Sequence, residues 1–247
     1  MTEAAVLEPL APAARDGSHA NRRPVDAATL VLVDHSARKP RVLLGKRHER
    51  QAFLPGKFVF PGGRVDPEDR RMPVFGTLDA DSERRLLART VRPSATRSRA
   101  LALAAIRETF EETGLFIGTA EAGPPPGPLP AGWQAFGEAG LFPDLEALSF
   151  VARAITPPRL ARRFDTRFFL ADASAVAHRV DGIAGPDSEL VELRWLTFDE
   201  ARDIDILSIT RIVLEEVERR LEAGSGRRLP VPFYYMRGKS FLREVLE

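Results

Sequence analysis

Three glutamates at helical spacing constrain this chain more than any other feature. Glu108, Glu111 and Glu112 stand at positions i, i+3 and i+4, so in an α-helix their carboxylates share one face. Like charges in one stripe repel each other, and the arrangement lowers stability unless a cation lies against it. Mg²⁺ is a hard cation that is held by carboxylate oxygens together with substrate phosphates. Because Gly114 is a natural stop for this helix, the stripe predicts a divalent-metal site near a helix C-terminus.

A glycine turn lies upstream of the glutamate stripe. Phe60 ends an apolar stretch that runs through Pro61 into Gly62 and Gly63. Because glycine has no side chain, the backbone of such a turn can approach a ligand closely. The turn is therefore a second candidate for a binding element.

Together these two segments resemble the signature of the Nudix hydrolases. The second half of that signature fits closely at residues 107–115, with Thr109 at a position that is more often aliphatic. The first half is interrupted, because 37 residues separate Asp69 from Arg107 where the family has seven. The extra segment, residues 70–99, carries eight arginines against three acidic residues, which gives a net charge of +5.

The resemblance implies hydrolysis of a diphosphate linkage with Mg²⁺ or Mn²⁺ as cofactor. Glu108 is then either a metal ligand or the base that orients the attacking water. Arg107 would pair with an acid of the glycine loop, Asp69 or Glu68, and so fix the helix to that loop. The metal ligands that the resemblance implies are Glu108, Glu111, Glu112 and the backbone carbonyl of Gly62.

A further acid in Nudix sites often comes from a loop after the motif. Glu189 and Glu192 are the candidates here, because they flank the start of the strand expected at 191–196. We assign the catalytic role to Glu189, which lies in a loop-like stretch rich in Gly, Pro, Asp and Ser. The alternative for either residue is an ordinary surface carboxylate.

The stretch from Leu43 to Gly63 resembles the extra motif of the Nudix coenzyme A diphosphatases. The substrate-binding residues that match this motif are Arg47, Gly56, Phe60 and Gly63. Ala52 stands where the second arginine of the motif belongs, while His48 and Gly45 replace its small residue and its threonine. The alternative is that this Leu-Leu-x-x-Arg strand is simply common to many Nudix proteins.

Residues 53–55, 59–67 and 163–169 resemble the peroxisomal-type subgroup of these enzymes, whose motif also carries a long insertion. This resemblance implies that coenzyme A or an acyl-CoA is split into 3′,5′-ADP and a phosphopantetheine product, with the arginine-rich insertion near the phosphates. Two alternatives stay open. One is hydrolysis of ADP-ribose, NADH or a nucleotide sugar, and the other is a non-catalytic Nudix-fold ligand sensor, against which the three retained glutamates argue.

Hydrophobic periodicity predicts both strands and helices, which indicates the α/β (α+β) class. The expected strands are 27–33, 41–47, 58–60, 115–118, 148–155, 164–170 and 191–196, and the expected helices are 81–90, a long one from about Ser98 to Gly114, 133–147 and 209–221. This order suits a Nudix-type α/β/α sandwich with a mixed sheet. We divide the chain into a flexible tail at 1–24, a Nudix domain at 25–222 with the insertion at 70–99, and a C-terminal extension at 223–247.

Composition excludes several classes of protein. The chain has no cysteine, so it has no disulfide, thiolate metal site or cysteine nucleophile. No apolar run approaches the ~18 residues of a membrane span, and the N-terminus lacks the apolar core of a signal peptide. The net charge of +1 gives no general attraction to nucleic acid. We therefore expect a cytoplasmic enzyme with a small-molecule diphosphate substrate and no nucleic-acid or membrane partner, and we leave a homodimer open.

Overall fold

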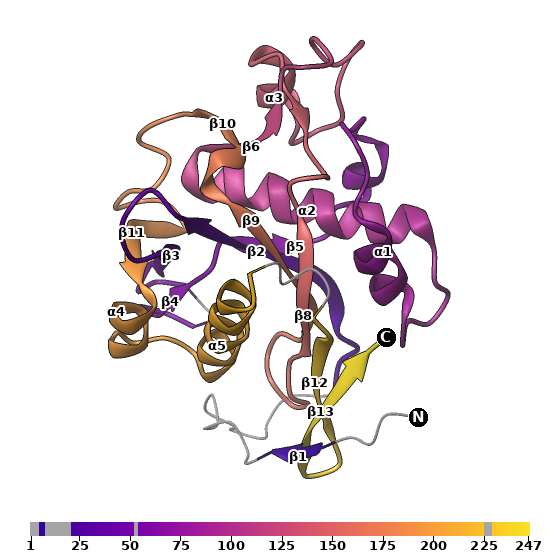
Figure 1. The fold of residues 1–247 in the computed structure, drawn as a ribbon, viewed down its shortest axis with the longest axis vertical. Helices are drawn as coiled ribbons and strands as arrows, with labels where there is room; N and C mark the ends of the chain where they lie inside the picture. Colours follow the sequence, from indigo (N-terminus) through magenta and orange to yellow (C-terminus); the bar gives the residue numbers. More distant parts are fainter. Residues whose placement is uncertain (1–4, 8–20, 52–53, 225–228) are drawn as a thin grey trace.

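The computed structural model describes residues 5–7, 21–51, 54–224 and 229–247, which form a large sheet with helices on both faces (Figure 1). The sheet has ten strands: eight follow the order β1-β13-β12-β8-β9-β2-β3-β11, while β4 pairs with β3 and β5 with β2. It is mixed, because β9 runs parallel to β2 and β12 runs parallel to β8, whereas its other pairs are antiparallel. A smaller sheet has the order β10-β6-β7.

The strands are β1 Ala5–Leu7, β2 Val25–Asp34, β3 Arg41–Arg47, β4 Phe58–Val59, β5 Gly62–Arg64, β6 Leu115–Thr119, β7 Phe142–Pro143, β8 Ser149–Ile155, β9 Phe164–Asp172, β10 Val176–Arg179, β11 Leu190–Thr197, β12 Val231–Arg237 and β13 Ser240–Leu246. The helices are α1 Ala80–Leu87, α2 Ala95–Thr113, α3 Gln134–Glu138, α4 Phe198–Asp203 and α5 Ser208–Glu222, with short 3₁₀ turns at η1 Pro67–Arg71 and η2 Ala173–Ala175. Across the described residues, none of the helices has both the length and the apolar character that a membrane crossing requires.

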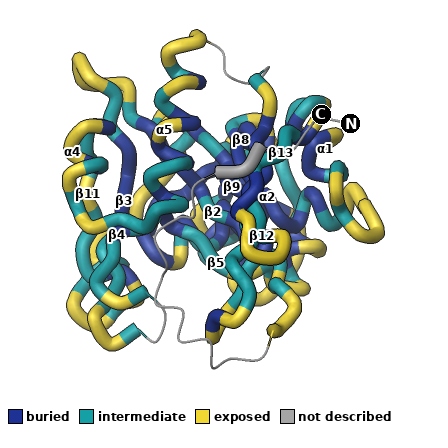
Figure 2. The backbone as a smooth tube through the Cα atoms, turned by 90° about the horizontal axis from the view of Figure 1, so that it is seen from below, coloured by how far each residue is buried: buried dark blue, intermediate teal, exposed yellow. Residues whose placement is uncertain are grey.

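Strand β2 is buried on both faces, and its alternating side chains enter two separate cores. Leu30 and Leu32 pack into the core shared with α2, whereas Val31 and Val33 pack into the core shared with α5. The helices α2 and α5 therefore cover opposite faces of the sheet, and the buried backbone gathers between them (Figures 1 and 2). This confirms the predicted α/β/α sandwich with a mixed sheet.

The predicted elements are present with shifted ends, except for the helix expected at 133–147. There α3 covers only Gln134–Glu138, and residues 142–143 form β7 instead. Gly140 has φ +66°, a left-handed conformation that ends the helix and that glycine adopts without steric cost. The helical spacing of this segment was thus overridden by a glycine close to its middle.

Both ends of the chain add strands to the main sheet. The segment predicted to be a C-terminal extension forms β12 and β13, and its residues Val231, Phe233 and Leu246 belong to the core shared with α2. Within the predicted flexible tail, β1 pairs with β13, while residues 1–4 and 8–20 lie outside the described residues.

The insertion folds against the end of α2 that is remote from the glutamate stripe (Figure 1). Its helix α1 packs on β8, where Ser82 Oγ accepts a hydrogen bond from the Phe150 N–H at 3.0 Å. Between Arg97 and Glu112, α2 rises ~22 Å at 1.5 Å per residue. Five of the arginines in the insertion have partners in the chain itself: Arg71 with Glu68, Arg84 with Asp81, Arg89 with Glu244, Arg97 with Asp26, and Arg99 with the Arg70 carbonyl. These contacts give the insertion a structural role, and its expected role near the substrate phosphates stays a prediction.

A buried ion network ties the insertion to the sheet. Arg153 on β8 donates two hydrogen bonds to Asp165 on β9, at 2.8 and 2.7 Å. Its Nη1 also donates to the carbonyls of Ala88 and Arg89, just after α1, at 3.3 and 3.1 Å. Because these carbonyls follow the last turn of α1, the pair of β8 and β9 holds the end of that helix in place.

Arg167 extends this network to the start of α2. It is fully buried, and its Nη1 lies 3.0 Å from Asp26 Oδ1 and 3.1 Å from Asp165 Oδ2. Asp26 in turn accepts two hydrogen bonds of 2.7 Å from Arg97. Burial lowers the pKa of Arg167 to about 10, against the opposing effect of Asp165, so the guanidinium stays charged at neutral pH. The stretch 163–169 therefore has a structural role in this chain.

We expect the substitution Asp165→Ala to lower the free energy of unfolding by ~3–5 kcal/mol, because it leaves the buried Arg153 without a carboxylate partner and the buried Arg167 with Asp26 alone. Urea denaturation followed by circular dichroism measures the loss. The matched control is Asp199→Ala, which removes an exposed carboxylate that also pairs with two cations and should change the free energy of unfolding far less. Similar losses in the two variants would contradict the anchoring role of the network.

Candidate active site

The glutamate stripe occupies the last two turns of α2, and Gly114 fixes where that helix ends. Gly114 has φ +75°, and its N–H donates to the Phe110 carbonyl at 2.8 Å. A β-carbon at this position would also collide with the carbonyl of Val180. Glycine is thus required for both conformation and space, and the C-terminus of α2 is held beside the strand β10.

The glycine turn lies directly against the stripe. The Gly62 N–H donates a hydrogen bond to the Glu112 carboxylate at 2.9 Å, and a β-carbon at Gly63 would overlap the carboxylate of Glu108. The turn is held in place because β5 pairs residues 62–64 with residues 27–29 of β2. The two segments singled out in the sequence therefore meet in the fold.

Asp69 is the acid of the glycine loop that pairs with Arg107. The Arg107 Nε lies 2.8 Å from Asp69 Oδ1, and its Nη2 lies 3.2 Å from Oδ2. Both side chains are buried. Glu68, the alternative partner, instead pairs with the exposed Arg71 at 3.1 Å. The interrupted motif thus still forms its central ion pair, through Asp69.

The remaining nitrogens of Arg107 hold two members of the stripe. Nη1 lies 3.0 Å from Glu108 and 2.8 Å from Glu111, and Nη2 donates to the Arg64 carbonyl at 2.9 Å. Burial opposes the charged guanidinium, but the hydrogen bonds that Arg107 donates to Asp69 and the charges of the carboxylates raise the pKa of Arg107 above its usual value. Arg107 is therefore a permanent cation at the base of the stripe.

The three glutamates differ in exposure: Glu112 is buried, Glu108 is mostly buried, and the Glu111 side chain is 40% exposed. Burial, together with the charges of Glu111 and Glu189, raises the pKa of Glu108 to about 7 against the opposing effect of Arg107. Burial also raises the pKa of Glu111, and it raises that of Glu112 well above the ordinary value despite the hydrogen bond from Gly62. The negative charge of the stripe is therefore only partly neutralised by the protein.

Glu189 belongs to this group of acids, whereas Glu192 does not. Glu189 Oε1 lies 2.9 Å from the Arg47 Nη2, and its charge contributes to the raised pKa of both Glu108 and Glu112. Glu192 is paired with Arg194 at 2.6 Å on a partly exposed part of β11. Of the two acids considered from the sequence, the fold brings only Glu189 to the stripe.

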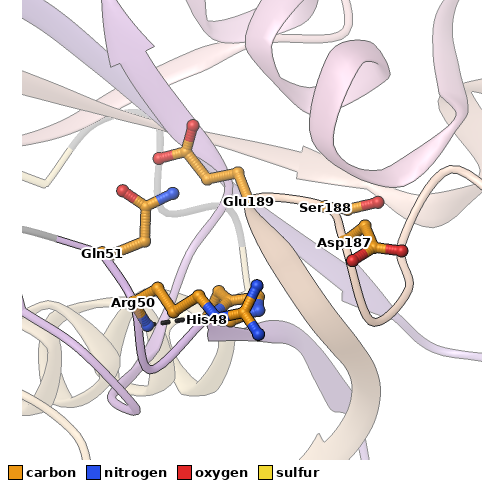
Figure 3. Close-up of a pocket in the computed structure, with 6 residues that line it drawn as sticks. All are labelled: His48, Arg50, Gln51, Asp187, Ser188 and Glu189. Atoms are coloured by element: carbon orange, nitrogen blue, oxygen red, sulfur yellow. Dashed lines mark hydrogen bonds between the residues drawn. The ribbon is translucent and has the colours of Figure 1, made fainter.

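A pocket of about 240 Å³ opens beside Glu189 (Figure 3). Its lining comes from the loop after β3 and the loop before β11: His48, Arg50, Gln51, Asp187, Ser188 and Glu189. The His48 Nδ1 accepts a hydrogen bond from the Arg50 N–H at 2.9 Å, which leaves the other ring nitrogen for a ligand. The pocket is polar and shares Glu189 with the acidic site.

The other residues predicted to bind substrate have different positions. Phe60 is only 4% exposed and packs in the core shared with α5, so its predicted role in substrate binding is corrected to a structural one. Gly56 has φ +69° and lies against the Glu49 carboxylate, where it shapes the loop after β3. Ala52 lies outside the described residues.

Sequence reasoning missed two residues of the site. Asp66 caps the turn η1, and Asp69 completes that capping box, a pattern of two acids three residues apart that the sequence does contain. Trp133 donates its indole N–H to Asp69 Oδ1 at 3.2 Å. The sequence carries no sign of this contact, because the two residues lie far apart along the chain.

The donors of the site have the chemistry that Mg²⁺ or Mn²⁺ requires, since they are carboxylate oxygens in a desolvated setting. As they stand, Gly62 holds Glu112 and Arg107 holds Glu108 and Glu111. No three acidic or histidine side chains converge as a ready metal cluster in the part of the chain that the structure describes. Because the negative charge is incompletely neutralised, the residues fit a divalent cation, which would displace some of these hydrogen bonds.

Comparisons with known proteins give two informative likenesses, although no family model matches the chain. The chain is 28% identical over 215 residues to the human acyl-coenzyme A diphosphatase NUDT19, a match that covers 66% of this chain and 55% of that protein. The chain thus spans little more than half the length of this curated relative. A Nudix hydrolase structure from Alicyclobacillus acidocaldarius shares 28% identity with a TM-score of 0.57, and the match covers 79% of this chain and 91% of that one.

These likenesses agree with what the coordinates show independently. The sandwich, the glycine turn against the end of α2 and the pair of Arg107 with Asp69 unite the parts of the interrupted motif. The chain therefore has the fold and the interrupted motif of a Nudix hydrolase, and it resembles an acyl-coenzyme A diphosphatase.

Proposed function

We propose that this chain hydrolyses a diphosphate linkage with Mg²⁺ or Mn²⁺, and that its substrate is coenzyme A or an acyl-CoA, which gives 3′,5′-ADP and a phosphopantetheine product. The observation that carries the proposal is the stripe of Glu108, Glu111 and Glu112 against the glycine turn, with Arg107 beneath it. Glu112 and most of Glu108 are buried, and such a concentration of negative charge is costly in a protein without a cationic ligand. It supports a role in metal-assisted phosphate chemistry.

The residues that would hold the cation are Glu108, Glu111, Glu112 and the carbonyl of Gly62. When bound, a divalent cation neutralises phosphate oxygens and lowers the pKa of a coordinated water. The protein's own part is to orient the carboxylates, which Arg107 and the Gly62 N–H do from the two sides of the stripe.

Hydrolysis requires a group that accepts a proton from the attacking water. That water forms one P–O bond while the bridging P–O bond breaks, and the leaving phosphate takes up the electron pair. Glu189 is our proposed proton acceptor, because it lies near the stripe and is about half exposed, within reach of solvent and substrate. Glu108, with its pKa of about 7, is the alternative acceptor. Arg47, which pairs with Glu189, is our proposed cation for a substrate phosphate.

The coenzyme A part of the proposal rests on the likeness to the human acyl-coenzyme A diphosphatase and on the matched residues Arg47, Gly56 and Gly63. A panel of coenzyme A, an acyl-CoA, ADP-ribose, NADH and a nucleotide sugar tests it, with products separated by chromatography in Mg²⁺ and in EDTA. We expect 3′,5′-ADP and a phosphopantetheine from the first two, and only with metal. If ADP-ribose, NADH or the nucleotide sugar is cleaved in preference, that compound is the substrate and the coenzyme A assignment is wrong. Binding without turnover would indicate a ligand sensor.

Glu112→Gln should reduce turnover by at least ~10²-fold, because it removes one charged oxygen donor from the proposed metal site. The fold should survive, since a glutamine oxygen can still accept the hydrogen bond from Gly62 and a buried charge is lost. Steady-state kinetics and thermal denaturation measure the two effects. The control is Glu192→Gln, the same substitution at a glutamate that pairs with Arg194 outside the site. Turnover near that of the unmodified chain would remove Glu112 from the metal site.

The substitution Gly63→Ala should lower turnover without lowering the stability of the fold. The added methyl group would meet the end of the Glu108 side chain, which can rotate away, so the midpoint of thermal denaturation should change little. The rotated carboxylate could no longer serve the site, and turnover should fall by ~10-fold or more. Gly185→Ala is the matched control, because open space surrounds that glycine. Unchanged turnover in Gly63→Ala would show that the position of Glu108 does not matter.

Without metal, stability should fall as the pH rises from about 5 to 8. The folded pKa of Glu108 is about 7 against an ordinary value of 4.5, and the pKa of Glu111 and of Glu112 is also raised. Groups shifted in this direction stabilise the fold at low pH, and that contribution is lost as the pH passes their folded pKa. Thermal denaturation in EDTA measures the trend. Added Mg²⁺ should raise the midpoint more at pH 8 than at pH 5, because it binds deprotonated carboxylates. The opposite order would contradict metal binding at the stripe.

A further inference from the structure

Trp133 is buried beside the site and has one polar atom, its indole nitrogen. The ring is fully buried and packs on Phe136, with the ring centres 5.1 Å apart. Its N–H donates to Asp69 Oδ1 at 3.2 Å. Trp133 therefore touches the acid that holds Arg107, while remaining outside the glutamate stripe itself.

Asp69 depends on a complete set of donors because it has no contact with solvent. Its Oδ1 accepts from the Arg107 Nε and from Trp133, and its Oδ2 accepts from the Arg107 Nη2 and from the Asp66 N–H at 2.8 Å. These donors come from three separate parts of the chain. Together they fix the plane of the carboxylate, and a bidentate pair requires that plane to match the guanidinium.

Asp69 and Arg107 lie on different elements, η1 and α2, and their side chains meet across that boundary. The chain between them runs through the end of η1, through α1 and through the first part of α2. The segment ending at Trp133 lies against the pair from outside. A β-carbon at Gly132 would come 3.1 Å from the Arg107 Cδ and 3.4 Å from a Glu111 carboxylate oxygen. The backbone of residues 132–133 thus packs on Arg107 while the indole holds its partner.

We propose that Trp133 is a positioning residue of the active site: its N–H fixes Asp69, Asp69 fixes Arg107, and Arg107 sets Glu108 and Glu111 for a divalent cation. The inference rests on the proposed function, because it assigns Trp133 a task in that same site. It gives residues 132 and 133 the task of holding Asp69 and Arg107 together from outside the motif.

The test replaces one N–H group and leaves the shape of the ring intact. The chain has two tryptophans, Trp133 and Trp195, so a Trp195→Phe parent has a single tryptophan. Growth of a tryptophan auxotroph on β-(3-benzothienyl)alanine then places at position 133 a ring of the same shape with sulfur instead of N–H. A second variant, Trp133→Phe, also removes the donor. The readouts are the Kd for Mn²⁺, from the electron paramagnetic resonance signal of unbound Mn²⁺, and kcat and KM for coenzyme A.

We expect the benzothienyl protein to bind Mn²⁺ roughly 3- to 10-fold more weakly than its parent, as part of the ~10-fold or more that a hydrogen bond to a charged group is worth. The kcat should fall by a similar factor, while KM for coenzyme A stays within about twofold, because Trp133 touches no lining residue of the substrate pocket. The control Phe136→Leu removes a buried neighbour of the ring without touching Asp69. It should lower the denaturation midpoint and leave the Kd for Mn²⁺ unchanged.

Two results would overturn the inference: a Kd for Mn²⁺ equal to that of the parent in both variants at position 133, or an equal weakening in Phe136→Leu. Either would reduce Trp133 to a packing residue. Failure of the proposed function has a different signature, since the parent would then bind Mn²⁺ and hydrolyse no diphosphate of the panel. In that case the comparison of Kd values still decides the role of Trp133. A parent without Mn²⁺ binding would contradict both.

Discussion

The buried pair between Arg107 and Asp69 is the interaction on which the rest of the site depends. One guanidinium meets the Asp69 carboxylate edge-on, reaches Glu108 and Glu111 with its remaining amine and donates to the Arg64 carbonyl. It therefore joins the loop after β5 to the last turns of α2. Because both partners of the pair are buried, loss of either would leave an uncompensated charge, and the orientation of the stripe would be lost with it.

The site concentrates negative charge that the protein itself does not balance, so the fold must supply stability elsewhere. It does so in two ways. Two apolar cores lie on the two faces of the sheet, and a network of three arginines and two aspartates holds α2, β2, β8 and β9 together at the end remote from the stripe. The first turn of α2 is thus held by the ion pair of Arg97 with Asp26, whereas its last turns carry acids whose charge the protein does not fully neutralise. The residues that stabilise the fold and those proposed to bind the metal therefore lie at opposite ends of one helix.

Much of the fold could be predicted from the sequence, because its signals are local. The period of the strands, the stripe on α2 and the stop at Gly114 follow from residue spacing alone, and so does the apposition of the glycine turn once the interrupted motif is recognised. The helix expected at 133–147 was wrong, since Gly140 ends it early. Phe60 also illustrates the limit of a motif, because a matched residue can serve the core instead of the ligand.

What could not be predicted depends on contacts between distant parts of the chain. The arginines of the insertion have no pattern that tells ion pairs within the protein from contacts with phosphate, and only the fold shows that Arg97 meets Asp26. The contact of Trp133 with Asp69 is likewise visible only in the fold, because all of α2 lies between the two residues in the sequence. The sequence favours Glu189 over Glu192 only through its loop-like surroundings, and the fold shows that Glu189 meets Arg47 while Glu192 pairs with Arg194.

Strand β2 has a consequence for the motions of the protein. It pairs with β9 along nine residues, is buried on both faces, and carries the glycine turn through β5 and through the hydrogen bond of the Leu30 N–H to the Pro61 carbonyl. Amide protons at the centre of such a strand exchange with solvent only when the whole domain unfolds. We therefore expect the turn that faces the stripe to be attached to a slowly exchanging part of the described chain. Small local openings, of the kind that loosen surface loops, will leave the position of Gly62 relative to Glu112 unchanged.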